Sequence, residues 1–239
     1  RLGEKLAALV LAWLAPVGVL ERALGREQAS TLDDLATVIF SSGSTGEPKG
    51  VMLTHYNIAS NVAQLGQTFD FGPQDRFLGI LPFFHSFGFT ATLIAPALLG
   101  IGVAFHPSPL DAKPIGDLVR RYGLTYLMAT PTFLQLYLRS CEPSDFGSLK
   151  CVMVGAEKLP ERLASAFEEK FGLRPVEGYG CTECSPVVTG NTHDFRAAGV
   201  RQAGSRRGSI GRPLPGVSLR IVDPETGAPR PVGQAGLLL

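Results

Sequence analysis

Residues 41–51 concentrate the residue types that bind anions. Hydroxyl side chains, glycines and one lysine, Lys49, follow directly on the apolar run 35–40. Glycines let backbone N–H groups turn toward one anion without a Cβ atom in the way, while hydroxyls and an ammonium group supply further donors. The segment therefore predicts a phosphate-binding loop, and nucleotide chemistry is the first hypothesis.

Two other interpretations of this segment are weaker. The P-loop of nucleoside triphosphatases needs a glycine directly before the lysine and a hydroxyl residue directly after it, but Pro48 and Gly50 occupy these positions. A plain surface turn would also collect serine, glycine and proline. The ordered succession of residues and the terminal lysine favour phosphate binding over a turn.

Three further segments carry candidate functional groups, and each follows a run that predicts a strand. Residues 178–183 combine two glycines, an aromatic ring, a hydroxyl and a carboxylate, and residues 82–89 surround His85 with phenylalanines. Residues 155–159 begin with small side chains, which would let a ligand approach the backbone. Because ligands of open parallel sheets bind outside the carboxyl ends of the strands, these segments are expected to share one edge of the sheet.

The order of residues 41–51 closely resembles the signature loop of the adenylate-forming superfamily, which contains acyl-CoA synthetases, peptide-synthetase adenylation domains and luciferases. Residues 178–183 match its second diagnostic motif and stand about 130 residues after the loop, as in its members. Residues 155–159 match the stretch that lines its adenine and acyl pockets. The resemblance implies ATP-dependent activation of a carboxylate.

The resemblance also implies a role for individual residues. Tyr179 would offer an aromatic face to adenine, the Thr182 hydroxyl would meet the α-phosphate, and Glu183 would supply a hard oxygen for Mg²⁺. Thr45 would also hold Mg²⁺, and His85, Thr182 and Glu183 would be the catalytic residues. The residues expected to bind ATP are Ser41, Ser42, Gly43, Ser44, Thr45, Gly46, Lys49, Gly155, Ala156, Glu157, Gly178, Tyr179 and Gly180.

Residues 82–89 bear on the acid substrate. In amino-acid-activating members of the superfamily an aspartate near this place pairs with the substrate ammonium group, but this segment contains no acidic residue. An apolar carboxylic acid fits better, with His85 near the reacting carboxylate. The alternative for His85 is a core histidine with its hydrogen bond satisfied, and the alternative for Glu157 is a solvent-facing acid at the start of a helix.

Three other patterns are weaker candidates. Cys181 and Cys184 form a C-x-x-C pair, but no second pair at zinc spacing accompanies them, so a zinc site is rejected. His106 and Asp111 have the H-x4-D spacing of glycerolipid acyltransferases, but two prolines lie between them and the spacing is interpreted as a coincidence. No G-x-S-x-G sequence supports a serine-hydrolase nucleophile.

Apolar runs and helical periods alternate from residue 101 to residue 177. Strands are expected at 101–105, 124–128, 151–154 and 175–177, and helices at 111–122, 131–140 and 160–171. Such alternation predicts a parallel sheet covered by helices on both faces. The uncharged stretch 77–110 is broken by prolines, glycines and histidines, and it is expected to form a buried strand, helix and strand rather than a membrane span.

The fold class expected is therefore α/β, with parallel sheets flanked by helices and a β-rich subdomain at the C-terminal end. Residues 1–34 are expected to hold an amphipathic helix at 1–15, closed by Pro16, and a connecting loop. Residues 35–185 are expected to form the AMP-binding α/β core. Helical periodicity fades beyond residue 185, so 186–239 is expected to be β-rich.

Composition narrows the class of protein. Of the 239 residues, 45% are hydrophobic and 18% are charged, which is ordinary for a globular protein. The formal net charge is +1 and the charges are dispersed, so nucleic-acid binding is not expected. Four cysteines without a signal peptide favour a reducing compartment, the cytoplasmic side.

Within the superfamily, residues 37–239 look most like the synthetase half of bacterial bifunctional acyl-[acyl-carrier-protein] synthetase/2-acylglycerophosphoethanolamine acyltransferases. This likeness implies that a fatty acid and ATP give acyl-AMP and pyrophosphate. The acyl group would then pass to a phosphopantetheine thiol of acyl carrier protein or CoA, in phospholipid acyl recycling. Peripheral association of the full-length parent with the cytoplasmic membrane stays open.

The chain is expected to be a fragment, because it begins at Arg1 without methionine and stops in an apolar run. The C-terminal domain that carries the adenylation lysine in the superfamily is absent from it, and little acyl-adenylate formation is expected from this segment alone. Two alternatives are an amino-acid-activating adenylation module and a non-catalytic nucleotide-binding relic.

Overall fold

The computed structural model describes residues 3, 10, 13, 15–23, 25, 30–41, 47–192 and 194–239. Its contacts separate two units, Arg1–Asp34 and Leu35–Leu239. Most of the helix expected at 1–15 lies outside the described residues. The domain boundaries expected at residues 34 and 185 stay a prediction.

In the first unit, helix α2 (Val17–Ala23) begins directly after Pro16. The Pro16 carbonyl accepts hydrogen bonds from the N–H groups of Val19 and Leu20. The sequence did not predict this second helix, and a proline suits a helix start because it has no N–H that the helix would need there. The end of the expected helix 1–15 at Pro16 stays a prediction. None of the helices within the described part of the chain has the length and hydropathy of a membrane span.

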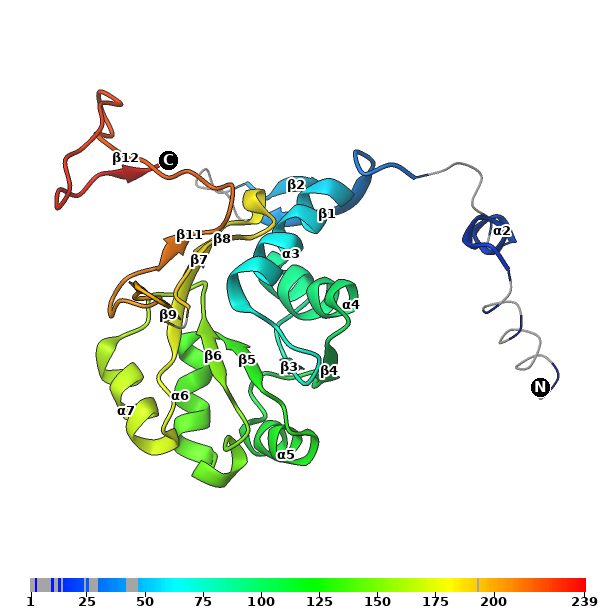
Figure 1. Cartoon of the computed structure of the whole chain (residues 1–239), viewed down its shortest axis with the longest axis horizontal. Helices are drawn as coiled ribbons and strands as arrows, with labels where there is room; N and C mark the ends of the chain where they lie inside the picture. Colours follow the sequence, from blue (N-terminus) through cyan, green and yellow to red (C-terminus); the bar gives the residue numbers. More distant parts are fainter. Residues whose placement is uncertain are drawn as a thin grey trace. The chain divides into compact units, whose positions relative to one another are not determined.

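A seven-stranded sheet forms the centre of the second unit, with the strand order β11-β8-β7-β6-β5-β3-β4 (Figure 1). The bounds are Arg76–Gly79 (β3), Gly102–Phe105 (β4), Tyr126–Ala129 (β5), Cys151–Val154 (β6), Val176–Gly180 (β7), Val187–Gly190 (β8) and Arg212–Pro213 (β11). Strands β4, β3, β5, β6 and β7 are parallel, whereas β8 and β11 are antiparallel to their neighbours. The α/β class is confirmed, and the sheet is mixed because of these last two strands.

Helices cover both faces of the sheet (Figure 1). One face carries α5 (Ala112–Tyr122), α6 (Pro131–Ser140) and α7 (Glu161–Phe171). The other face carries α3 (His55–Phe69), the π-helix η1 (Phe87–Ile94) and α4 (Ala95–Leu99). The buried strand, helix and strand expected at 77–110 are thus present as β3, η1 with α4, and β4.

Alternate residues of the central strands enter the two cores. In β5, Leu127 packs under the first helix layer and Tyr126 under the second, and in β6 Val152 and Met153 divide in the same way. Successive side chains of a strand point to opposite faces, so strands buried on both faces are apolar throughout. This explains why short uninterrupted apolar runs were sufficient to locate them.

The remaining strands form two-stranded antiparallel pairs. These are β1 (Leu35–Ser41) with β2 (Lys49–Thr54), β9 (Phe195–Ala197) with β10 (Val200–Gln202), and β12 (Ile221–Val222) with β13 (Leu237–Leu238). A short 3-10 helix, η3 (Thr182–Cys184), lies in the turn between β7 and β8. The hairpin β7–β8 and the end of β6 support the candidate site.

Candidate functional site

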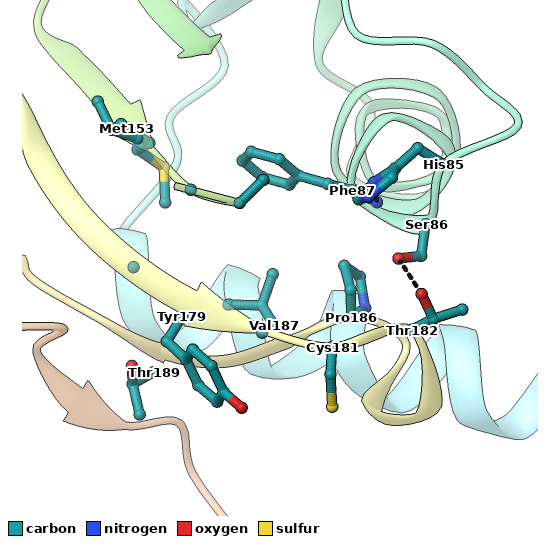
Figure 2. Close-up of a pocket in the computed structure, with 15 residues that line it drawn as sticks. His85, Ser86, Phe87, Met153, Tyr179, Cys181, Thr182, Pro186, Val187 and Thr189 are labelled. Carbon is teal, nitrogen blue, oxygen red and sulfur yellow. Dashed lines mark hydrogen bonds between the residues drawn. The ribbon is translucent and has the colours of Figure 1, made fainter. Parts of the chain in front are cut away.

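A cavity of about 210 Å³ lies at the carboxyl ends of β6 and β7 (Figure 2). Three chain segments line it: the residues before and at the start of η1, the loop after β6, and the β7–β8 hairpin. The lining residues are His85, Ser86, Phe87, Met153, Val154, Gly155, Ala156, Gly178, Tyr179, Gly180, Cys181, Thr182, Pro186, Val187 and Thr189. The expectation that the motifs meet at one edge of the sheet agrees with this arrangement.

The loop after β6 needs small residues where it passes η1. A Cβ atom at Gly155 would lie 3.2 Å from the ring of Phe87, and Ala156 has a φ of +66°. Positive φ is costly for residues with a side chain and is least strained when that side chain is small. The loop can therefore present its backbone to the cavity without closing it.

The hairpin β7–β8 is also closely packed. Strand β7 extends through Gly180, whereas the sequence predicted that it ends near residue 177, so Gly178, Tyr179 and Gly180 lie in the strand rather than after it. Pairing of Tyr179 with Thr189 and of Gly178 with Gly190 continues the strand.

A side-chain hydrogen bond closes the cavity on one side. The Ser86 hydroxyl donates to Thr182 Oγ1 at 3.4 Å, and Figure 2 shows this bond between the two facing segments. The N–H of Phe87 donates to Nδ1 of His85 at 3.3 Å, so a neutral His85 ring carries its hydrogen on Nε2. Thr182 and His85, both expected in the site, are thus brought together from distant parts of the sequence.

Tyr179 and Glu183 border a second cavity of about 440 Å³, between the hairpin and α3. The Tyr179 side chain is 40% exposed, so its ring is free to stack on a ligand. Partial desolvation and the neighbouring Cys181 thiol raise the pKa of Cys184, on the same cavity, to about 11. Glu183 lines this second cavity and not the first, so its carboxylate lies beside the first cavity.

Asn61, on α3, holds the hairpin against the helix. Its Nδ2 donates to the Val187 carbonyl at 2.7 Å, and its Oδ1 accepts from the Val187 N–H at 3.1 Å. Its side chain is buried, and an amide that meets both backbone groups acts as a short strand partner. Sequence reasoning missed Asn61, although a polar residue on the apolar face of an amphipathic helix is a usable signal of such a contact.

Several residues of the predicted site do not line the first cavity. Ser42, Gly43, Ser44, Thr45 and Gly46 lie outside the described residues. Ser41 and Lys49 are paired at the open ends of β1 and β2, and β2 packs against η3, which carries Thr182 and Glu183. Glu157 is exposed and accepts a hydrogen bond from the Thr132 hydroxyl at 2.8 Å.

The H-x4-D pair forms a contact of its own. Nε2 of His106 lies 2.9 Å from Oδ2 of Asp111, across the loop that leads from β4 into α5. Neither residue lines a cavity with the candidate site. The contact holds the loop together. The H-x4-D spacing is therefore still interpreted as a coincidence and not as an acyltransferase motif.

The fold and the site define an α/β protein with a ligand cavity at the carboxyl ends of its parallel strands. Residues 7–239 match the model of the family described as AMP-binding enzyme, and the chain belongs to that family.

The relatives include a fatty-acid–CoA ligase and a peptide-antibiotic synthase. The chain is 34% identical over 200 residues to the long-chain-fatty-acid–CoA ligase of Bacillus subtilis, covering 81% of this chain and 34% of that protein. It is 37% identical over 209 residues to tyrocidine synthase 3 of Brevibacillus parabrevis, covering 86% of this chain and 3% of that protein. The crystal structure of ATP-bound MatB from Rhodopseudomonas palustris superposes with a TM-score of 0.76 at 33% identity, covering 87% of this chain and 40% of that chain. The chain thus spans well under half the length of these relatives.

Proposed function

We propose that this chain is the nucleotide- and acid-binding part of an ATP-dependent acid–thiol ligase whose acid is a fatty acid. One observation carries the proposal: the cavity joins His85, Gly155, Ala156, Tyr179 and Thr182 at one edge of the sheet. Family membership and the ATP-bound relative support an adenylate-forming reaction.

The nucleotide would occupy the side of the cavity formed by the β7–β8 hairpin. Tyr179 offers its exposed ring to adenine, and Thr182 offers a hydroxyl to the α-phosphate. Strand β2, which begins at Lys49, packs against η3, which carries Thr182 and Glu183. Lys49 and the hydroxyls of residues 41–45 would then hold the outer phosphates.

Magnesium suits this donor set. Mg²⁺ is usually held by one or two carboxylates together with phosphate oxygens, and Glu183 presents an exposed carboxylate beside Tyr179. When bound, the ion would neutralise phosphate charge. Thr45, the second expected ligand, lies outside the described residues.

The acid would occupy a smaller pocket of about 130 Å³ that shares His85, Phe87 and Ala156 with the main cavity. Its lining residues are Leu81, Pro82, Phe84, His85, Phe87, Gly88, Thr130, Phe133 and Ala156. None of these lining residues is a carboxylate that could pair with a substrate ammonium group. An apolar acid fits this pocket better than an amino acid, and this supports the likeness to fatty-acid ligases.

In the proposed reaction a carboxylate oxygen attacks the α-phosphorus of ATP, and the bond from that phosphorus to the bridging oxygen breaks to release pyrophosphate. The thiol of a phosphopantetheine group, on acyl carrier protein or CoA, then attacks the acyl carbon and AMP leaves. Positioning and charge stabilisation supply most of the catalysis in such phosphorus chemistry. A role in phospholipid acyl recycling on the cytoplasmic side belongs to the same proposal.

Non-hydrolysable acyl-adenylate analogues test the acid class directly. We expect palmitoyl-sulfamoyl-adenosine to bind this 239-residue chain at least about tenfold more tightly than phenylalanyl-sulfamoyl-adenosine in calorimetry. Lys49→Ala should weaken binding of Mg·ATP and Glu183→Ala should reduce its dependence on Mg²⁺, whereas Lys113→Ala, on the exposed side of α5, should change neither. Equal or tighter binding of the aminoacyl analogue would show an amino-acid-activating module instead.

A further inference from the structure

Cys181 and Cys184 flank Thr182 and Glu183 in the turn of the β7–β8 hairpin. The N–H of Cys184 donates to the carbonyl of Cys181 at 3.0 Å. A turn closed by such a bond holds its first and last α-carbons within about 7 Å, and disulfides span α-carbon separations of about 4.4 to 6.8 Å. The backbone is therefore already folded into the range that a disulfide needs.

Both thiols are accessible from one cavity. Cys181 and Cys184 are free cysteines that border the 440 Å³ cavity, and Cys184 is exposed. Figure 2 shows the Cys181 sulfur pointing away from His85 and Phe87. Its oxidation would therefore leave the acid side of the site unobstructed.

The other two cysteines differ from this pair in their access to solvent. Cys141 and Cys151 are buried in the two cores, and the Cys141 thiol donates to the Ala112 carbonyl at 3.2 Å. Oxidation needs a thiolate that the oxidant can reach, and buried structural cysteines are inert. They provide internal controls for the exposed pair.

We propose that Cys181 and Cys184 form a reversible intramolecular disulfide that weakens nucleotide binding at the site. With hydrogen peroxide as the oxidant, one thiol becomes a sulfenic acid and releases water, and the other sulfur then attacks it to form the S–S bond and release a second water. Two thiols and one peroxide thus give one disulfide and two waters, because the sulfurs give up the two electrons that reduce the peroxide. A dithiol reductant returns both electrons and both protons.

The effect on nucleotides rests on the function proposed above. Thr182 and Glu183 are the two residues inside the ring that the disulfide closes. Closure would fix their backbone angles, so the turn could no longer adjust to bring the Thr182 hydroxyl, which now meets Ser86 at 3.4 Å, onto a phosphate. The same closure would fix the backbone that carries the Glu183 carboxylate.

Peptide mapping tests the disulfide itself. Residues 171–196 form one tryptic peptide that contains both cysteines, because trypsin does not cleave at Arg174 before proline. After hydrogen peroxide and then N-ethylmaleimide, we expect this peptide to lose about 2 Da and to carry no maleimide, while Cys141 and Cys151 still react after denaturation. Dithiothreitol should restore both maleimide sites.

Two variants separate this site from general oxidation. Cys184→Ser should abolish the loss of mass and leave a Cys181 sulfenic acid that dimedone traps, whereas Cys141→Ala should form the disulfide normally. Maleimide on both cysteines of peptide 171–196 after peroxide, or linkage between two chains instead, overturns the proposal.

Binding of methylanthraniloyl-ATP with Mg²⁺ tests the consequence. We expect about tenfold weaker binding by the oxidised chain, recovery with dithiothreitol, and no change on peroxide treatment of Cys184→Ser. If the disulfide forms and both redox states bind equally, the link to nucleotide binding is overturned. If neither state binds, the proposed function fails while the disulfide result stands.

Discussion

Gly180 stands where β7 approaches the backbone of the following strand most closely. A Cβ atom built at this position would overlap with the carbonyl oxygen of Pro186. The same oxygen accepts the hydrogen bond of the Cys181 N–H at 3.0 Å. A glycine in a strand often marks such a close approach of two backbones, and here it sets the shape of one wall of the cavity.

We expect Gly180→Ala to lower the free energy of unfolding by about 2 kcal/mol, because the added carbon forces the hairpin apart. Binding of methylanthraniloyl-ATP should weaken as well, since Tyr179 and Thr182 lie on either side of the substitution. Urea unfolding and fluorescence titration measure the two effects. Gly147→Ala is the control, because a Cβ there would meet its nearest atom at 3.8 Å; equal behaviour of the two variants would contradict the argument.

Helices and strands that carry a clear apolar period and a flanking proline or glycine could be predicted from the sequence. Helix α6 and strand β6 have the bounds expected, and α5 and α7 each begin one residue later, because apolar periodicity and flanking proline or glycine mark both ends. Strands β8 and β11 were missed. They are short, and their positions depend on contacts rather than on their own composition: β8 pairs with β7 and meets Asn61, and β11 pairs with β8.

The residues of the candidate site also fall into those that the sequence predicted and those that it did not. Residues in recognisable motifs, such as His85, Ala156 and Thr182, were expected and do line the cavity. Val187 and Thr189 were not expected, because only the antiparallel return of β8 brings them beside β7. Motif spacing locates residues that bind, whereas tertiary pairing decides which others complete the wall.

Asp75 ties three strands together at the end of the sheet opposite the site. Its carboxylate accepts hydrogen bonds from Lys150 Nζ at 2.7 Å, the Thr125 hydroxyl at 3.0 Å and the Gly72 N–H at 2.8 Å. These partners precede β6, β5 and β3. Burial alone would raise the pKa of Asp75, but these hydrogen bonds outweigh it and hold the pKa below its usual value.

A lowered pKa in the folded state means that the unfolded chain binds the proton more readily. The carboxylate therefore stabilises the fold at pH values above its unfolded pKa of about 4, and this contribution is lost as pH falls through the lower folded pKa. We expect Asp75→Asn to lower the free energy of unfolding at neutral pH by about 2 kcal/mol, with the difference from the parent closing below about pH 4.

Urea unfolding over a pH series measures this profile. The control is Asp117→Asn, which removes an exposed pair with Arg120 and should change stability by less than about 1 kcal/mol at any pH. A constant difference between Asp75→Asn and the parent from neutral to acidic pH would show that the charge is not responsible.

At the scale of the second unit, the two cores share one set of strands. Leu127 and Phe77 are both essentially unexposed, and they lie in opposite clusters although β3 and β5 are neighbours. A helix layer cannot leave one face of the sheet without exposing strands that the other layer also needs. The unit should therefore unfold as one cooperative body.

We expect Leu127→Ala and Phe77→Ala each to lower the free energy of unfolding by about 3 to 4 kcal/mol, because each leaves a cavity in a close-packed core. Native-state hydrogen exchange distinguishes shared from separate cores: the slowest amides of α3 and of α5 should lose the same protection free energy in either variant, since only global unfolding exposes them. Leu98→Ala, at a site 60% exposed on α4, should leave both sets unchanged. If Leu127→Ala released only the amides of α5, α6 and α7, the sheet would be holding two independent layers, and the shared strands would not couple them.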